Sequence, residues 1–134
     1  MGYEVLKVCF HERTSKRPEG DVVILKNGAE NKYLVMHIQE DGTLSVTNKQ
    51  TQETYHQLNT FVEKGDDGDE YNYSPCIDDT EIRINDIHPM ITCIESSSIE
   101  VKYRLEYQIQ VPEKVVDHHR VQALKPLKIC SDVS

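Results

Sequence analysis

Tryptophan is absent from the 134-residue sequence, and phenylalanine occurs only twice. A hydrophobic core must therefore consist mainly of valine, isoleucine, leucine and tyrosine side chains. No apolar run approaches the ~20 residues that a helix needs to span a bilayer, and the first residues carry neither the basic region nor the apolar region of a signal peptide. We expect a cytoplasmic chain with no membrane segment.

Positive charge is also in short supply, with 15 Lys and Arg residues against 23 Asp and Glu residues and a formal net charge of −8. A nucleic-acid-binding protein usually presents a basic face to the phosphates, and an anionic membrane surface attracts basic segments. The charge balance therefore argues against both as partners.

Cysteine occurs four times, at positions 9, 76, 93 and 130, without a C-x-x-C pair or metal-ligand spacing to a histidine. Without a secretion signal, reduced thiols are the expected state. His118 and His119 are adjacent after Asp117, but neighbouring side chains of an extended chain point to opposite sides, which favours a solvated loop over a metal site. We therefore assign this chain no metal ligand, no cofactor and no catalytic residue.

The segment from Ser98 to Val111 alternates without a break, with apolar or tyrosine residues at odd positions and polar residues at even positions. Period-two alternation is typical of a strand with one face on a core and the other in water. Fully extended, the segment would measure about 45 Å, so a bend or bulge is expected within it. The predicted buried face consists of Ile99, Val101, Tyr103, Leu105, Tyr107 and Ile109.

Other strand-like runs lie along the whole chain at short intervals. They are Tyr3 to Phe10, Asp21 to Lys26, Tyr33 to Gln39, Leu44 to Thr47, Glu53 to Val62, Glu81 to Ile87, Met90 to Ile94 and Leu124 to Cys130. Asp41-Gly42 between two of them is a strong hairpin signal. No stretch shows a helical stripe or a linker, so residues 1–134 are predicted to form one all-β unit, an antiparallel sandwich.

One stretch, from Gly65 to Pro75, differs from the strands around it: it contains four acidic residues, two glycines and two tyrosines. Three interpretations are open. The stretch could be a solvated turn, as many surface loops are. It could be a Ca²⁺ loop, although the acidic residues lack the Asp-x-Asp-x-Asp-Gly spacing. It could also be a sugar-facing loop, because tyrosine offers a flat apolar face and a hydroxyl.

The motif Gly65-Asp66-Asp67-Gly68-Asp69-Glu70-Tyr71-Asn72-Tyr73-Ser74-Pro75, together with Asp41-Gly42-Thr43-Leu44 before it, resembles the β-rich region of bacterial α-mannosidases of glycoside hydrolase family 38. The subgroup with the mannosylglycerate hydrolases is the most similar. The resemblance extends over about residues 31–111. It implies a truncated β-sandwich of the galactose-mutarotase type that accompanies many glycosidases.

The resemblance also implies a larger enzyme in which this chain helps to bind the substrate and another part catalyses the reaction. The family has a tyrosine in a Tyr-x-aromatic-x-Pro setting that lines the sugar pocket; Tyr71, Tyr73 and Pro75 fit this pattern, and Asp69 precedes it. Tyr71, Tyr73 and Asp69 are thus the expected substrate-binding residues. The family's Asp nucleophile, acid/base carboxylate and Zn²⁺ lie upstream, in a catalytic barrel that would be the partner of this segment in a mannoside hydrolase.

Two interpretations from other classes remain open: a stand-alone carbohydrate-binding module and a purely structural interaction domain. The resemblance to part of a larger β region also implies that the sheet is cut: a segment removed from a larger sheet has an unpaired edge, so we expect self-association through that edge.

Overall fold

The computed structural model describes residues 20–134, which form strands, turns and one short 3-10 helix, Ile84–Asp86. The strands are β1 (Val23–Leu25), β2 (Gly28–Glu30), β3 (Leu34–Ile38), β4 (Leu44–Asn48), β5 (Thr54–Leu58), β6 (Val62–Glu63), β7 (Ile82–Arg83), β8 (Met90–Ser96), β9 (Val101–Pro112), β10 (Val115–Val116), β11 (His119–Arg120) and β12 (Leu124–Val133). The predictions for residues 3–10 and for Cys9 lie outside the described part of the chain.

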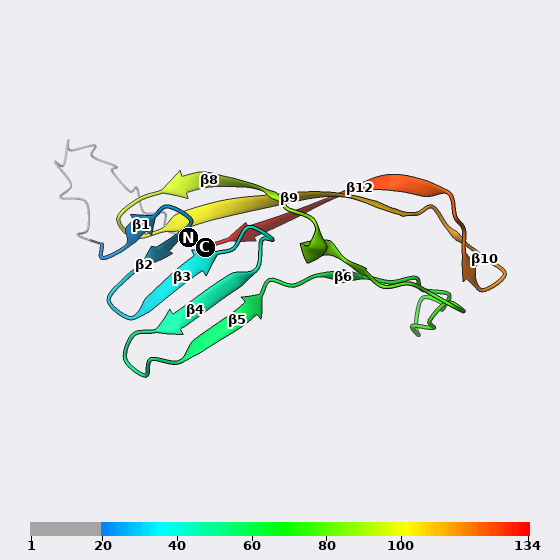
Figure 1. Ribbon diagram of the computed structural model, residues 1–134, viewed down its shortest axis with the longest axis horizontal. Coiled ribbons are helices and arrows are strands. Elements are labelled where there is room, and N and C mark those ends of the chain that lie inside the picture. Colours follow the sequence, from blue (N-terminus) through cyan, green and yellow to red (C-terminus); the bar gives the residue numbers. More distant parts are fainter. Residues whose placement is uncertain (1–19) are drawn as a thin grey trace, which may run out of the picture.

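Two antiparallel sheets form the body of the molecule. One has five strands in the order β1-β2-β3-β4-β5, and the other has three in the order β12-β9-β8. Two further pairs, β6 with β7 and β10 with β11, extend from this body, and β10 lies at the far end of the long β9 and β12 strands (Figure 1). The prediction of an all-β antiparallel sandwich is therefore confirmed. In the described residues, no helix could span a membrane.

The predicted hairpin at Asp41-Gly42 connects β3 to β4. Gly42 has a φ of +77°, a left-handed conformation that glycine adopts without steric cost. Gln39 N–H donates to the Thr43 carbonyl at 2.8 Å, and the Asp41 carboxylate accepts from both the backbone N–H and the hydroxyl of Thr43. Local side-chain bonds of this kind are why Asp-Gly pairs mark turns.

The alternating segment forms β9, the central strand of the three-stranded sheet. Its odd positions Val101, Tyr103, Leu105, Tyr107, Ile109 and Val111 are all buried and make up most of the core. The Tyr103 hydroxyl donates to the Gly28 carbonyl at 2.8 Å and so ties the two sheets together.

One detail of that prediction was wrong. Ile99 is not in the strand: it lies in the turn between β8 and β9, where Ser97 N–H donates to the Glu100 carbonyl, and it is 61 % exposed. The register shift of the β8–β9 pair does not fall in β9. It lies in β8, between Cys93 and Glu95.

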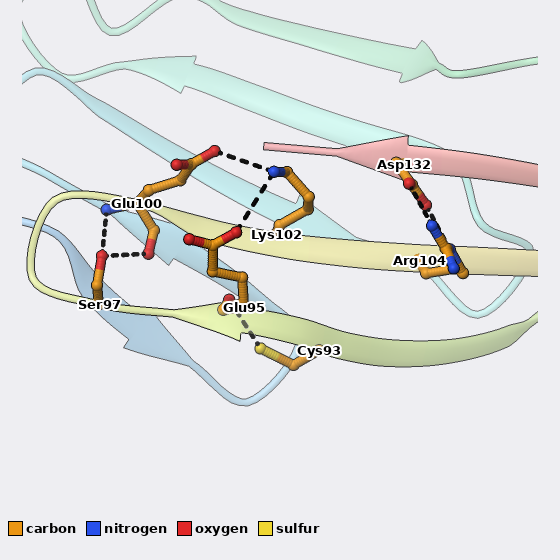
Figure 2. Close-up of polar contacts among 7 residues, drawn as sticks. All are labelled: Cys93, Glu95, Ser97, Glu100, Lys102, Arg104 and Asp132. Carbon is orange, nitrogen blue, oxygen red and sulfur yellow. Dashed lines mark hydrogen bonds and ion pairs between the residues drawn. The ribbon is translucent and has the colours of Figure 1, made fainter.

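The even positions of β9 form a charged outer face, which is visible in Figure 2. Lys102 lies between Glu95 and Glu100, and Arg104 makes a two-pronged ion pair with Asp132 of β12, both bonds measuring 2.7 Å. Cys93 is exposed on β8, with its thiol directed at the Glu95 carbonyl. The charged side chains of β9 therefore suit its outer face to contact with solvent.

Two predicted strands are interrupted in the structure. The run Glu53 to Val62 is divided into β5 and β6, because Asn59, just after β5, adopts a left-handed φ value of 61°. The run Glu81 to Ile87 is strand only at β7 and then becomes the 3-10 turn. The side chain of Asn85 explains both breaks, since it accepts from Phe61 N–H and donates to the carbonyl of Asn59.

The three-stranded sheet covers only part of the five-stranded one. Tyr55 and Leu58 of β5 lie opposite Val46 and Leu44 in the register and so share the face on which Leu44 is buried. Tyr55 is nevertheless 57 % exposed and Leu58 is 40 % exposed. An apolar strip along β5 thus lies beyond the edge of the sandwich.

Candidate functional site

The stretch from Gly65 to Pro75 is a closed loop between β6 and β7, next to the β10–β11 hairpin at the end of the molecule (Figure 1). Its ends meet at a β-bridge between Asp66 and Pro75, and Asp67 N–H donates to the Ser74 carbonyl at 2.8 Å. We refer to residues 65–75 as the acidic loop.

The carboxylates of the acidic loop bind its own backbone. Asp66 Oδ1 accepts from the N–H groups of Gly68 and Ser74, at 2.8 Å and 3.1 Å. Asp69 Oδ1 accepts from the N–H groups of Tyr71 and Asn72, both at 2.9 Å, and these two bonds lower the pKa of Asp69. The acidic residues therefore shape the loop, as aspartate does in Asx turns.

The two tyrosines of the acidic loop are presented to solvent. Tyr71 is 82 % exposed and Tyr73 is 60 % exposed. Large side chains on a hydrogen-bonded loop, with no core contact of their own, are suited to contact another surface or a ligand. The role of Tyr71, Tyr73 and Asp69 in substrate binding stays a prediction.

A cluster of charged side chains lies beneath the acidic loop. Arg120 of β11, whose side chain is only 8 % exposed, donates through Nη2 to both carboxylate oxygens of Glu63 at 2.8 Å and 2.6 Å, and through Nη1 to Asp79 at 3.0 Å. The other oxygen of Asp79 accepts from Gly65 N–H at 2.7 Å. Burial alone would raise the pKa of Asp79, but the bonds from Gly65 and Arg120 outweigh it and lower that pKa.

Sequence reasoning missed this cluster. Arg120 is 57 residues from Glu63 and 41 from Asp79 in the chain, so no local pattern joins them. The adjacent histidines of the sequence did mark one part of this region, the turn beside the acidic loop. Asp117 and His118, with φ values of 50° and 68°, form the two-residue turn of the β10–β11 hairpin, and His118 Nδ1 contacts the carboxylate of Asp67.

The positions of these groups leave no metal site in the described residues: between 20 and 134, no three His, Cys, Asp or Glu side chains are placed to hold an ion. The Ca²⁺ interpretation of the acidic loop therefore finds no support in its geometry. A shallow groove of about 360 Å³ lies beside the cluster, lined by Arg120, Asp79, Ile82 and Leu124 among others.

No protein-family model matches the sequence, and no curated protein matches it. Two solved structures are similar to this chain over 85 % of its length, with a TM-score of 0.79 and 24 % identity. One is an α-mannosidase from Enterococcus faecalis V583, and the other is a protein of glycosyl hydrolase family 38 from Enterococcus faecalis.

The chain has the fold of an α-mannosidase segment. This result confirms, at the level of fold, the resemblance to glycoside hydrolase family 38 noted in the sequence. The chain spans 15 % and 16 % of the two α-mannosidase-related chains.

Proposed function

We propose that this chain is the β-sandwich portion of a retaining, zinc-dependent α-mannosidase of glycoside hydrolase family 38. In this proposal it supports the catalytic barrel, and its acidic loop completes one wall of the sugar pocket. The observation that carries the proposal is the fold match over 85 % of the chain at a TM-score of 0.79. The two exposed tyrosines on the hydrogen-bonded acidic loop support its proposed place in the wall of the sugar pocket.

The chemistry would lie outside this chain. A retaining glycosidase uses a carboxylate nucleophile and a second carboxylate that acts first as acid and then as base. Zinc would polarise the substrate from ligands elsewhere in the parent protein, because the described residues offer no cluster that fits a metal. The proposed contribution of this chain is to bind and orient the sugar, in a cytoplasmic enzyme that hydrolyses terminal α-mannosides.

Tyr71 is the residue proposed to contact the sugar directly. Its ring offers an apolar face to the C–H side of a pyranose, and its hydroxyl can donate to a sugar oxygen. Tyr73 is two residues away and is also exposed, so it is proposed as a second contact. Asp69 fixes the backbone N–H of Tyr71 and is proposed to hold the tyrosine at the pocket.

The test is hydrolysis of a panel of α-mannosides by the full-length parent protein. We expect turnover with retention of the anomeric configuration, and no turnover by the isolated 134-residue chain with or without Zn²⁺. Failure of the full-length protein on every α-mannoside, combined with sugar binding by the isolated chain, would favour the carbohydrate-binding module instead.

The role of Tyr71 is tested in the same full-length protein. Tyr71→Phe removes one hydroxyl, which is worth about 0.5–1.5 kcal/mol with a neutral partner and up to about 3 kcal/mol with a charged one. We expect kcat/KM to fall by a factor of about 2 to 150 while Tm stays unchanged. Tyr33→Phe, at a tyrosine that is 60 % exposed and outside the acidic loop, is the matched control, and Tyr73→Phe measures the second contact. Lower stability with unchanged activity would make Tyr71 a packing residue.

A further inference from the structure

The acidic loop rests on the β10–β11 hairpin rather than on the strands that precede and follow it. Two residues after its start, the Asp67 carboxylate contacts His118 at the hairpin turn. After its end, Ile77 N–H donates to the His118 carbonyl at 2.8 Å. At its beginning, Gly65 N–H is held by Asp79, which is held in turn by Arg120 of β11. The hairpin therefore determines where the loop lies.

Arg120 is the side chain on which the other partners converge. It contacts both Glu63, the last residue of β6, and Asp79, which precedes β7. A guanidinium group has a fixed planar fork, so it sets the angle between the groups that it binds as well as their distance. At 8 % exposure, these bonds are shielded from water and from salt.

Gly65 is packed closely against the same side chain. A Cβ atom at this position would lie 2.6 Å from Arg120 Cδ and 2.7 Å from Cys76 Sγ, well inside van der Waals contact. Cys76 is itself buried. While Arg120 occupies its present place, only a glycine fits at the start of the acidic loop, so steric fit and ion pairing fix the same point of the backbone.

We propose that Arg120 is a positioning residue for sugar binding: it fixes the base of the acidic loop and thereby holds Tyr71 at the substrate pocket. This inference rests on the proposed function of the loop. Arg120 does not touch the sugar. It acts through Asp79 and Gly65, and Tyr71 is only six positions after Gly65, so a shift in the position of the base also displaces the tyrosine.

The first arm of the test measures the loop itself, without any substrate. Amide hydrogen exchange of the 134-residue chain is compared for wild type, Arg120→Met and Gly65→Ala. We expect the amides of residues 65–74 to exchange about tenfold faster in both variants, with β9 nearly unchanged. Arg120→Met leaves two carboxylates unpaired and could fail to fold for that reason. Gly65→Ala keeps every charge, so in that case it alone tests whether the base holds the acidic loop in place.

The control is Arg104→Met. Arg104 also makes a two-pronged pair with a carboxylate, but on the exposed outer face of β9 (Figure 2). This variant should leave exchange in the acidic loop at the wild-type rate. Arg120→Lys keeps the charge without the fork and should fall between wild type and Arg120→Met. Wild-type exchange in both Arg120→Met and Gly65→Ala would overturn the proposal.

The second arm measures the full-length enzyme on an aryl α-mannoside. Loss of a wall that binds substrate and transition state alike raises KM and leaves kcat unchanged. We expect Arg120→Met to raise KM about tenfold with kcat within about twofold of wild type, and Arg104→Met to change neither. An equal effect of both variants would overturn a positioning role. If the wild-type enzyme hydrolyses no α-mannoside, the proposed function fails, while the exchange arm still decides whether Arg120 holds the loop.

Discussion

At the scale of single residues, Gly42 shows how a turn and a core can depend on one missing side chain. Its φ of +77° suits the β3–β4 hairpin. A Cβ atom there would also lie 2.0 Å from the Tyr107 hydroxyl and 2.8 Å from Pro89 Cγ. Tyr107 is fully buried, so it has little room to withdraw. The position therefore requires glycine for two independent reasons.

Substitution at Gly42 separates these two reasons. We expect Gly42→Ala to destabilise the fold by more than about 2 kcal/mol, the sum of a left-handed backbone penalty and a steric clash. The expected loss of Tm is about 5–10 °C. Gly42→Asn tolerates the backbone conformation but still carries the Cβ atom, so we expect it to be nearly as severe. An Asn variant with wild-type Tm in a thermal melt would show that the clash with Tyr107 is relieved at little cost.

At the scale of elements, β9 supplies most of the buried core residues, and this burial stops where the strand begins. Leu105 is completely buried in the middle of the strand, whereas Ile99, two residues before the strand begins, is 61 % exposed. Both belong to the same alternating pattern in the sequence. Their contributions to stability should nevertheless differ widely.

We expect Leu105→Ala to lower the free energy of unfolding by about 2–5 kcal/mol, because it leaves a cavity in the core. Ile99→Ala should change it by less than about 0.5 kcal/mol, as surface substitutions usually do. Urea denaturation of both variants provides the comparison. Similar losses in the two would mean that Ile99 packs as a core residue after all.

The elements that the sequence predicted are those that depend on neighbouring residues. The alternation of β9 and the Asp41-Gly42 turn are local, and both were found in the structure. The breaks after β5 and β7 depend on Asn85, which bonds to groups 24 and 26 residues away. Such bonds leave no periodic trace in the sequence. The same reason hid the Arg120 cluster, while the acidic loop itself stood out from the strands around it by its composition.

At the scale of the whole molecule, the two sheets of the sandwich differ in size. The three-stranded sheet leaves the strip of Tyr55 and Leu58 along β5 uncovered, and β5 is also a sheet edge. In the three-stranded sheet, the edge strand β12 is better protected against pairing, because Pro126 offers no N–H and Lys125 and Lys128 add charge. Association between copies is therefore expected at β5 rather than at β12.

Self-association of the 134-residue chain is the corresponding prediction. In sedimentation equilibrium at high protein concentration, the wild type should show an average mass above 15.5 kDa. The double variant Tyr55→Lys/Leu58→Lys should bring the mass back to that of a monomer, because charges on an edge strand oppose pairing. Tyr33→Lys, at another exposed tyrosine, should not. A wild type that remains monomeric throughout would contradict this prediction.

The bond from Tyr103 to the Gly28 carbonyl joins residues 75 positions apart. This separation along the chain delays formation of the sandwich during synthesis. A ribosome completes all five strands of the first sheet before it begins β9, roughly 40 residues later. At roughly 5–20 residues per second, the apolar face of that sheet waits roughly 2–9 s for the strand that closes it. During synthesis the nascent chain is therefore open to chaperones and to misassembly over this interval, and β9 is the strand whose arrival ends it.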